Sequence, residues 1–234
     1  MKDCLYIDNH ILVVAKNRNI SLKDFKEEIK KELEKENLKS SFLEEVYPIC
    51  FEASGIVTFS LSSKAKERFL KQIEDGEFLL KNFAVCVGKP KYKNRVLYID
   101  ETDESKEEIS EQFVHRSNKT GLLEFIPRLN EDATKIYSSY SVLEDNEKIS
   151  LVKILGGFSF DDEVRFLMKE AKSPIFGDKK YEGEALAKNT NLALSVVEVK
   201  FSHPISGKNM SFRYYPEIDK KPWLYFNVEK FLKI

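Results

Sequence analysis

The spacing of apolar positions changes along this chain, and each change predicts a new secondary-structure element. Residues 4–16 hold two apolar runs separated by a polar turn at 8–10, a pattern typical of a β-hairpin. In residues 21–37 the apolar positions recur at helical spacing between lysines and glutamates, and Ser21 with Asp24 can cap the first turn. The opening of the chain therefore predicts a hairpin followed by an amphipathic surface helix.

The middle of the chain predicts three strands and one helix. Residues 56–61 are rich in β-forming side chains, and residues 62–73 place apolar side chains at helical spacing behind two serines that can cap the helix. Residues 78–88 and 95–99 are further apolar runs, and the glycine and proline between them suit a turn. Residues 100–111 are acidic and lack clear apolar periodicity, which predicts an exposed connection or an irregular insertion.

The second half of the chain predicts mainly strands. Residues 137–144 and 150–155 are strand-forming runs around a short polar turn, which indicates a second hairpin. Residues 161–172 have the period of a short helix, and a proline soon afterwards ends it. Residues 192–201 and 210–215 predict a third hairpin around a turn that contains proline and glycine.

The composition supports a single globular domain. The chain has 234 residues, and its hydrophobic content of 42% is ample for a core. No repeat of solenoid period and no Pro- or Gly-rich linker divides it, so we expect one α+β domain over residues 1–234, with a mixed sheet and a cleft in which a polymer can lie. Lys and Arg number 38 against 39 Asp and Glu, so any nucleic-acid binding must depend on a local patch.

The cysteines and the N-terminus suggest a compartment. Cys4, Cys50 and Cys86 are odd in number and too widely spaced for a zinc site, so we expect reduced thiols and no bound metal. The N-terminus carries charge but no long apolar segment, and no apolar run reaches membrane-spanning length. These features predict a cytoplasmic protein that does not bind membranes.

Residues 46–55, with the sequence VYPICFEASG, are the most informative stretch of the chain. They resemble the catalytic loop of the RluA-type RNA pseudouridine synthases, V-H-R-L-D-x-x-T-S-G. Aligned without a gap, the loop keeps the family's first Val and its final Ser-Gly, while Tyr47 and Pro48 stand where His and Arg are expected. Cys50 stands where the family has its catalytic aspartate. The resemblance therefore implies the fold of a synthase but not its chemistry.

The resemblance covers nearly the whole chain, in the family's order. Residues 5–16 are similar to the family's opening L-Y-E-D-x-x-L-L-V-V-x-K-P, and residues 81–87 to K-x-Y-x-A-x-V. Residues 140–144 resemble Y-x-V-L-E, residues 173–181 resemble H-P-I-x-G-D-x-x-Y, and residues 199–207 resemble L-x-F-x-H-P-x-x-G. Together they imply the pseudouridine synthase catalytic-domain fold, a mixed, mainly antiparallel sheet with flanking helices and a central cleft, without a separate S4-type RNA-binding domain.

The reaction implied by the resemblance needs no cofactor and no metal. In active members a flipped-out uridine enters a pocket, the aspartate attacks the base or assists its departure, and the base rejoins through carbon. By position, Tyr140 is implied as the ring beside the base, Arg165 as the partner of the acid and Val164 as an apolar wall. The other implied substrate contacts are Tyr47, Lys16 and Lys81. The implied partner is RNA, either rRNA or tRNA. Without the resemblance, Tyr140 is an ordinary core tyrosine and Arg165 a surface charge.

Cys50 cannot take the aspartate's role directly, because a thiol is mostly neutral at pH 7 and offers a single, softer atom. Arg165 nearby would favour the thiolate, which leaves a nucleophilic cysteine open, although apolar packing is the commoner role. Residues 160–163 replace the family's Arg-Thr-His-Gln with a phenylalanine and three acids. These carboxylates would repel phosphate, or they form an acidic helix start. Substitutions on both sides of the presumed pocket indicate a site remodelled as a unit.

Residues 114–125 also echo the catalytic loop and keep its histidine and arginine, as His115 and Arg116. This copy is two residues short before its glycine, and Asn118 stands at the aspartate position. We interpret it as a chance similarity in a basic surface loop, and a displaced active site is the alternative.

Three functions remain open. We favour a divergent RNA pseudouridine synthase homologue that binds RNA and has lost or weakened isomerase activity, because Cys50 replaces the catalytic aspartate. An active synthase with an altered site is one alternative. A protein-binding scaffold with a closed cleft is the other.

Overall fold

The computed structural model describes residues 3–36, 42–90, 97–98, 110–128, 130–181 and 190–232. Its strands are β1 (Cys4–Ile7), β2 (Ile11–Lys16), β3 (Glu44–Glu45), β4 (Ser54–Ser60), β5 (Leu79–Val87), β6 (Leu97–Tyr98), β7 (Ser110–Arg116), β8 (Leu123–Phe125), β9 (Thr134–Asp145), β10 (Ile149–Leu155), β11 (Leu194–Ser202) and β12 (Asn209–Arg213). Its helices are α1 (Leu22–Lys35), α2 (Ser63–Glu74) and α3 (Glu163–Glu170), with short 3-10 turns at Trp223–Tyr225 and Val228–Phe231.

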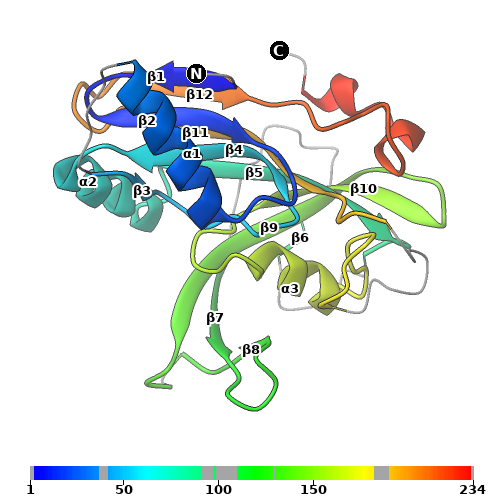
Figure 1. The fold of residues 1–234 in the computed structure, drawn as a ribbon. Coiled ribbons are helices and arrows are strands. Elements are labelled where there is room, and N and C mark those ends of the chain that lie inside the picture. The colour runs from blue at the N-terminus through cyan, green and yellow to red at the C-terminus, as the bar shows by residue number, and fades with distance from the viewer. Residues whose placement is uncertain are drawn as a thin grey trace.

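The strands form one twelve-stranded sheet, ordered β1-β2-β4-β11-β5-β10-β9-β7-β8 (Figure 1). β12 pairs with β11, β3 with β4, and β6 with β9. The β11–β4 and β6–β9 pairs are parallel, and every other pair of described strands is antiparallel. The expected α+β fold with a mixed, mainly antiparallel sheet is therefore confirmed. The pairing of β4 with β11 brings the 46–55 loop next to the second half of the chain.

Local sequence explains the first hairpin and the starts of two helices. β1 and β2 pair antiparallel, and the Asp8 carboxylate accepts hydrogen bonds from two backbone N–H groups in the turn between them. The hydroxyl of Ser21 accepts a hydrogen bond from the N–H of Asp24 at 3.0 Å, so the predicted cap of α1 is confirmed. Ser62 caps α2 in the same way.

Phe78 is the centre of an aromatic cluster that joins α2 to the sheet. Its ring stacks on Phe201 of β11 with 5.3 Å between centroids, and it meets Phe69 of α2 edge-on at 5.7 Å. Tyr47, from the loop that precedes β4, packs against the same ring at 5.8 Å. Tyr47 is therefore a core residue, and aromatic packing fixes the start of its loop.

Residues 114–125 are the end of β7, a turn at 117–122 and β8, so the expected basic surface loop is wrong for the strand residues, which include His115 and Arg116. β7 pairs with β8 and with β9, and this ribbon extends away from the main body of the sheet (Figure 1). The side chains of Val114 and Leu123 are buried and anchor it. The sequence did not show a clear strand pattern here, because only one side of a half-covered ribbon needs to be apolar and polar residues lie between the buried ones.

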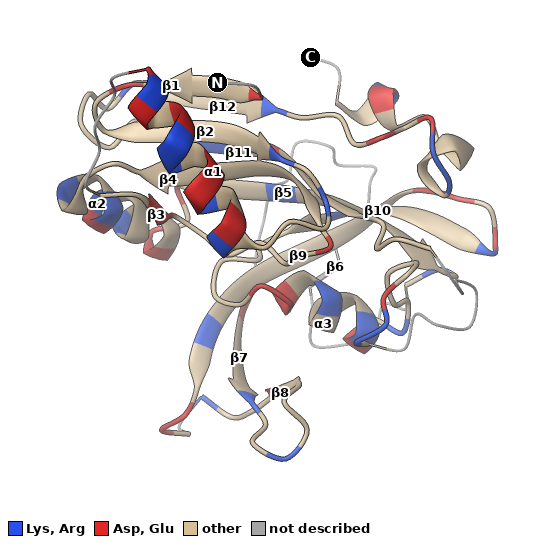
Figure 2. Cartoon of the chain, in the orientation of Figure 1, with Lys and Arg blue, Asp and Glu red and all other residues tan. Residues whose placement is uncertain are grey.

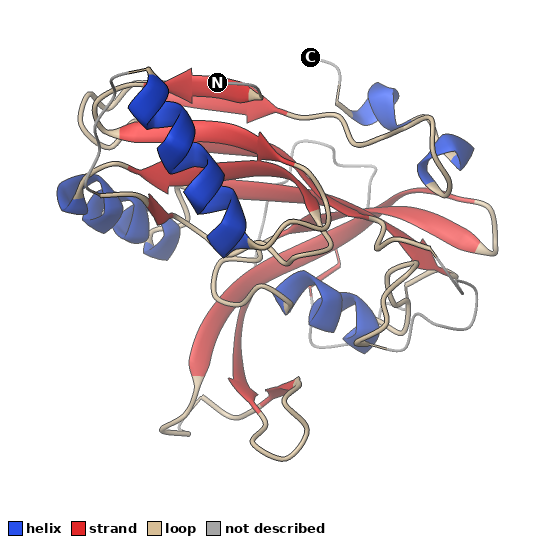
Figure 3. Cartoon of the chain, in the orientation of Figure 1, coloured by secondary structure: helices blue, strands red, loops and turns tan. Residues whose placement is uncertain are grey.

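The helices are few and short beside the strands (Figure 3). α1, the longest in the described part of the chain, has 14 residues, and no helix there is long and apolar enough to cross a membrane. Of the strand expected at 95–99, the structure describes only β6. The acidic connection expected at 100–111 lies outside the described residues, except where its end begins β7.

Replacing Gly55 with alanine should disrupt the centre of the sheet. Gly55 has a φ of +119°, and a Cβ there would lie 2.2 Å from the backbone oxygen of Val196 on β11. We expect Gly55→Ala to lower the free energy of unfolding by about 3 kcal/mol or more in urea denaturation, because backbone strain and steric clash add.

Gly76→Ala is the matched control for this prediction. Gly76 has a φ of +72°, and no atom lies within 4 Å of the added Cβ, so strain alone should cost about 1 kcal/mol. Equal losses in the two variants would show that the close approach of β4 and β11 does not limit stability.

Candidate functional site

Tyr47, at the family's histidine position, is a buried anchor of the candidate loop. Its ring is almost fully enclosed, and its hydroxyl donates a hydrogen bond to the carbonyl oxygen of Ile56 on β4 at 3.0 Å. Burial raises the pKa of this phenol, so it stays protonated at neutral pH. Tyr47 therefore ties the loop to the strand that follows it and fills space inside the protein.

Lys16, implied as a substrate contact, is used inside the protein. It ends β2, and its side chain is 0% exposed. Its ammonium donates to the carbonyl oxygens of Cys50 at 3.3 Å, Phe51 at 3.2 Å and Ala53 at 2.8 Å. Burial lowers the pKa of Lys16 to about 8. The negative charge of nearby Glu52 acts in the other direction and raises this pKa, but by less. This lysine holds the 50–53 turn in place, and its donors are engaged by the backbone.

Cys50 lies beneath this turn as a neutral thiol. It is 3% exposed, and burial raises its pKa to about 11, although the positive charge of Arg165 acts in the opposite direction. A thiol whose pKa is raised in this way is neutral at pH 7. The structure therefore brings Cys50, Arg165 and Lys16 together, but it supplies no ionised group at the aspartate position.

Arg165 is paired with two carboxylates. Its Nε and Nη2 donate to the two oxygens of Asp178 at 3.0 and 2.6 Å, and its Nη1 reaches Glu52 Oε2 at 3.4 Å. Burial alone would lower its pKa, and the Asp178 hydrogen bonds and charge outweigh burial and raise it. Sequence reasoning assigned no role to Asp178, although it is the aspartate of the matched segment 173–181. The acid that Arg165 pairs with is therefore Asp178, with Glu52 as a second partner.

Tyr140 and Lys16 share one face of the sheet but lie far apart on it. Pairing registers place Lys16, Gly55, Val196, Asn82, Ile154 and Tyr140 in one transverse row. Residues directly opposite each other on paired strands point to the same face. Five strand spacings separate the ends of this row, about 24 Å along the sheet. Tyr140 is buried on β9, and Val164 is buried on α3 near Gly157, which follows β10.

Lys81 lies outside the Cys50 group. It precedes Asn82 on β5, so its side chain projects from the opposite face of the sheet. There Lys81 Nζ pairs with Glu198 Oε2 at 2.5 Å, and Arg213 Nε donates to the other Glu198 oxygen at 2.7 Å. Lys81 therefore belongs to a cluster of charges around the buried Glu198.

Asp162 and Glu163 are internal, so the expected repulsion of phosphate by these two acids is wrong. Asp162 accepts hydrogen bonds from Arg116 at 2.8 and 3.1 Å, from the Tyr181 hydroxyl at 2.9 Å and from Lys180. Burial alone would raise its pKa, but these donors lower it to about 2. Glu163 accepts from the N–H groups that precede α3, and burial raises its pKa to about 7. The hydrogen bonds of both carboxylates fix the position of the start of α3.

Arg116 therefore has a structural partner in this fold. Its guanidinium links β7 to Asp162, and it lies 5.3 Å from the centroid of the Phe160 ring. Arg116 and Asp162 are 46 positions apart in the sequence, and no local sequence pattern predicts that they pair. The segment at His115 and Arg116 that resembles the catalytic loop therefore lies in β7, and the ion pair between Arg116 and Asp162 ties this strand to the start of α3.

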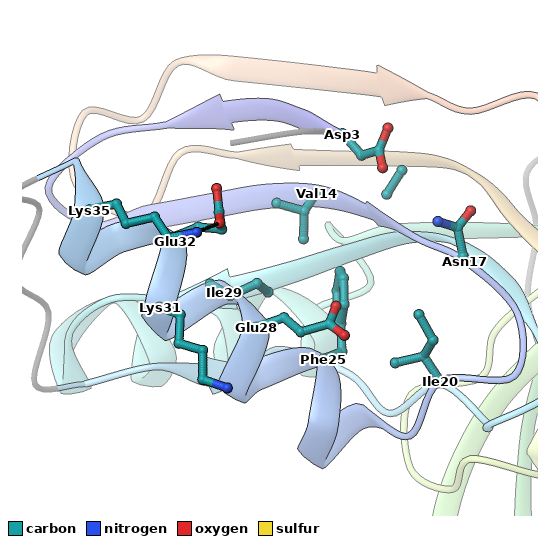
Figure 4. A pocket seen from close by; sticks show the side chains of 11 residues that line it. Asp3, Val14, Asn17, Ile20, Phe25, Glu28, Ile29, Lys31, Glu32 and Lys35 are labelled. Carbon is teal, nitrogen blue, oxygen red and sulfur yellow. Dashed lines mark hydrogen bonds and ion pairs between the residues drawn. The ribbon is translucent and has the colours of Figure 1, made fainter.

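A cavity of about 420 Å³ lies elsewhere, between α1 and the first hairpin (Figure 4). Its floor is apolar, with Val14, Phe25 and Ile29, and its rim carries charges of both signs. Carboxylates at Asp3 and Glu28 make it a poor place for RNA phosphates. Within the described ranges, no three His, Cys, Asp or Glu side chains form a group that could hold a metal ion.

Comparison with known proteins identifies the fold. No protein-family model matches the chain, and no curated protein matches it in sequence. Among solved structures, human RNA pseudouridylate synthase domain containing 4 has a TM-score of 0.68 at 11% identity, over 96% of this chain and 91% of its own. Human RNA pseudouridylate synthase domain containing 1 has a TM-score of 0.65 at 12% identity, over 94% and 85%. The expected pseudouridine synthase fold is confirmed.

The Cys50 thiol should resist alkylation in the folded protein. We expect iodoacetamide at pH 8 to label partly exposed Cys4 first, and to label Cys50 at least about tenfold more slowly, because a buried, neutral thiol is a poor nucleophile. Mass spectrometry of peptides measures the rates. Cys86, also buried, is the internal control, and all three thiols should react alike in denaturant. Fast labelling of Cys50 in the folded state would instead favour a nucleophilic role.

The Asp162 carboxylate should stabilise the fold at neutral pH. Its pKa of about 2 lies below its ordinary value of 3.8, so its contribution is present above pH 4 and is lost as the pH falls towards 2. We expect Asp162→Asn to lower the free energy of unfolding at pH 7 by about 2 kcal/mol, with a smaller difference from wild type at pH 3.

Urea denaturation across this pH range measures the effect. Asp161→Asn is the matched control, because Asp161 is the exposed neighbour, and its substitution should change stability by less than about 0.5 kcal/mol. A loss in Asp162→Asn that is the same at pH 7 and pH 3 would exclude the charge as its source.

Proposed function

We propose that this protein is a divergent homologue of the RluA-type pseudouridine synthases that binds RNA, either rRNA or tRNA, without isomerising uridine. The observation that carries the proposal is the state of Cys50. The position of the catalytic aspartate holds a neutral thiol that is 3% exposed, with a pKa of about 11. The reaction implied by the resemblance needs a carboxylate beside a flipped-out base, and this protein has a buried thiol at that position instead.

Three other residues of the implied site support the loss of isomerase activity. Arg165, the implied partner of the acid, already forms a two-point hydrogen-bonded pair with Asp178. Tyr47 and Tyr140 are buried as deeply as Cys50, so the side chains that would receive a base are packed against protein. A thiolate mechanism would need a thiol pKa near neutrality, which is opposite to the direction that burial imposes here.

RNA as the partner is supported by the fold that this chain shares with two RNA pseudouridylate synthase domain proteins. The charge distribution suits moderate rather than tight binding. Lysines and arginines alternate with acids along α1 and α2 (Figure 2), and the net charge is -1. We place the protein in the cytoplasm, where its three unpaired cysteines stay reduced.

A protein-binding scaffold is the second candidate, and the burial of the matched side chains favours it. Lys16, Cys50, Tyr140 and Arg165 are each buried, so the matched residues have structural roles whether or not RNA binds. RNA binding in solution separates the two candidates.

We expect the purified protein to bind rRNA or tRNA and to leave its uridines unchanged. Affinity, measured by fluorescence anisotropy, should fall about tenfold between 50 and 200 mM salt, as for a few phosphate contacts. Nucleoside mass spectrometry of the same RNA should show no gain in pseudouridine over a control without protein.

Each other result contradicts part of the proposal. Pseudouridine formed by the protein would show that the site is active. Absence of RNA binding at 50 mM salt would leave the scaffold as the better account.

A further inference from the structure

Phe51 is the one phenylalanine that this protein exposes. The chain has 17 phenylalanines, all within the described residues, and each of the others is buried or partly buried. Phe51 is 50% exposed. A single exposed apolar side chain is ordinary on a protein surface, so its meaning depends on where it lies and how it is held.

The backbone on both sides of this ring is tied down. The Phe51 carbonyl oxygen accepts hydrogen bonds from the ammonium of Lys16 at 3.2 Å and from the N–H of Asn19 at 2.8 Å. On one side Cys50 is also bonded to Lys16, and on the other Glu52 reaches Arg165. Lys16, Cys50 and Ala53, which lie at or beneath the turn, are buried. The backbone of Phe51 is therefore held in place, and its aromatic side chain is exposed to solvent.

Polar residues lie next to Phe51 in the turn and on the neighbouring loop that is hydrogen-bonded to its backbone. Asn19 is exposed, Glu52 is partly exposed, and Arg18 on the same neighbouring loop pairs with Glu217. A protein partner would need a larger contiguous apolar patch to bury at its centre. A nucleobase needs only one flat ring, since every base has a face that stacks on an aromatic side chain, and unpaired RNA bases are free to do so.

We propose that Phe51 is a stacking platform for an unpaired RNA base, on the outer side of the turn that buries Cys50. The inference rests on the proposed function, because it takes RNA as the ligand. It also states how RNA would meet this site: the base stays outside, on the ring, and does not enter the interior. Because stacking does not read base edges, the platform should tolerate any base.

The test uses the full-length protein and a labelled single-stranded RNA of about 12 nucleotides. Phe51→Ala should weaken binding about tenfold, because loss of one stacked base has an effect of that order. Phe51→Trp should bind at least as well as wild type. Leu70→Ala is the matched control, because Leu70 is a surface residue of α2 that is 45% exposed, and its substitution should leave affinity unchanged.

A fluorescence readout reports on the ring itself. The chain has one tryptophan, Trp223, which is buried. In Phe51→Trp, RNA should quench the emission of the introduced indole, whereas wild-type emission should change little. Urea denaturation of Phe51→Ala should match wild type, which separates loss of binding from loss of folding.

The outcomes separate this inference from the proposed function. If wild type binds neither rRNA nor tRNA, the proposed function fails, and the inference fails with it. If wild type binds rRNA or tRNA but not the single-stranded RNA, only the inference is overturned. If wild type binds but Phe51→Ala binds equally well, or the introduced indole is not quenched, only the inference is overturned. Equal weakening by Leu70→Ala would also overturn it, by showing a general apolar effect.

Discussion

The candidate site depends on one buried cation. Lys16 ends β2 beneath the turn at 50–53, and its ammonium donates to carbonyl oxygens of that turn and of Asn17. A buried ammonium is unfavourable unless acceptors replace its water, and buried carbonyl groups are unfavourable unless donors reach them. The lysine and the turn satisfy each other, so neither is stable in this place alone. The register that pairs Lys16 with Gly55 fixes where the turn closes.

This constraint has opposite effects on two adjacent residues. Cys50 is directed inward, where burial keeps its thiol neutral, and Phe51 is directed outward, where its ring meets solvent. A loop that resembles a catalytic loop thus has a buried inner side and an exposed outer side. Proteins only 11% and 12% identical to this chain share its overall backbone arrangement, so this arrangement tolerates extensive substitution.

Charged residues near the site serve the structure. Arg165 pairs with Asp178, Lys81 with Glu198, and Asp162 with Arg116 and Lys180. Lys81 and Glu198 are 117 positions apart and Arg116 and Asp162 are 46 apart, whereas Arg165 pairs with Asp178 over 13 positions and Asp162 with Lys180 over 18. Each carboxylate is almost fully buried. An unpaired charge at these depths would be strongly destabilising, so removal of one partner is costly even where the pair itself adds little.

The sequence by itself determined the local elements and the fold. The first hairpin and the Ser21 and Ser62 caps follow from short-range hydrogen bonds, and the ordered resemblance of separated segments predicted the pseudouridine synthase fold. It did not reveal the β7–β8 ribbon, whose buried positions are interrupted by polar ones. Only the tertiary structure decided which charges are internal, that Cys50 is buried and that Phe51 is exposed. Those properties depend on groups brought together from positions far apart in the chain, and local spacing carries no information about such partners.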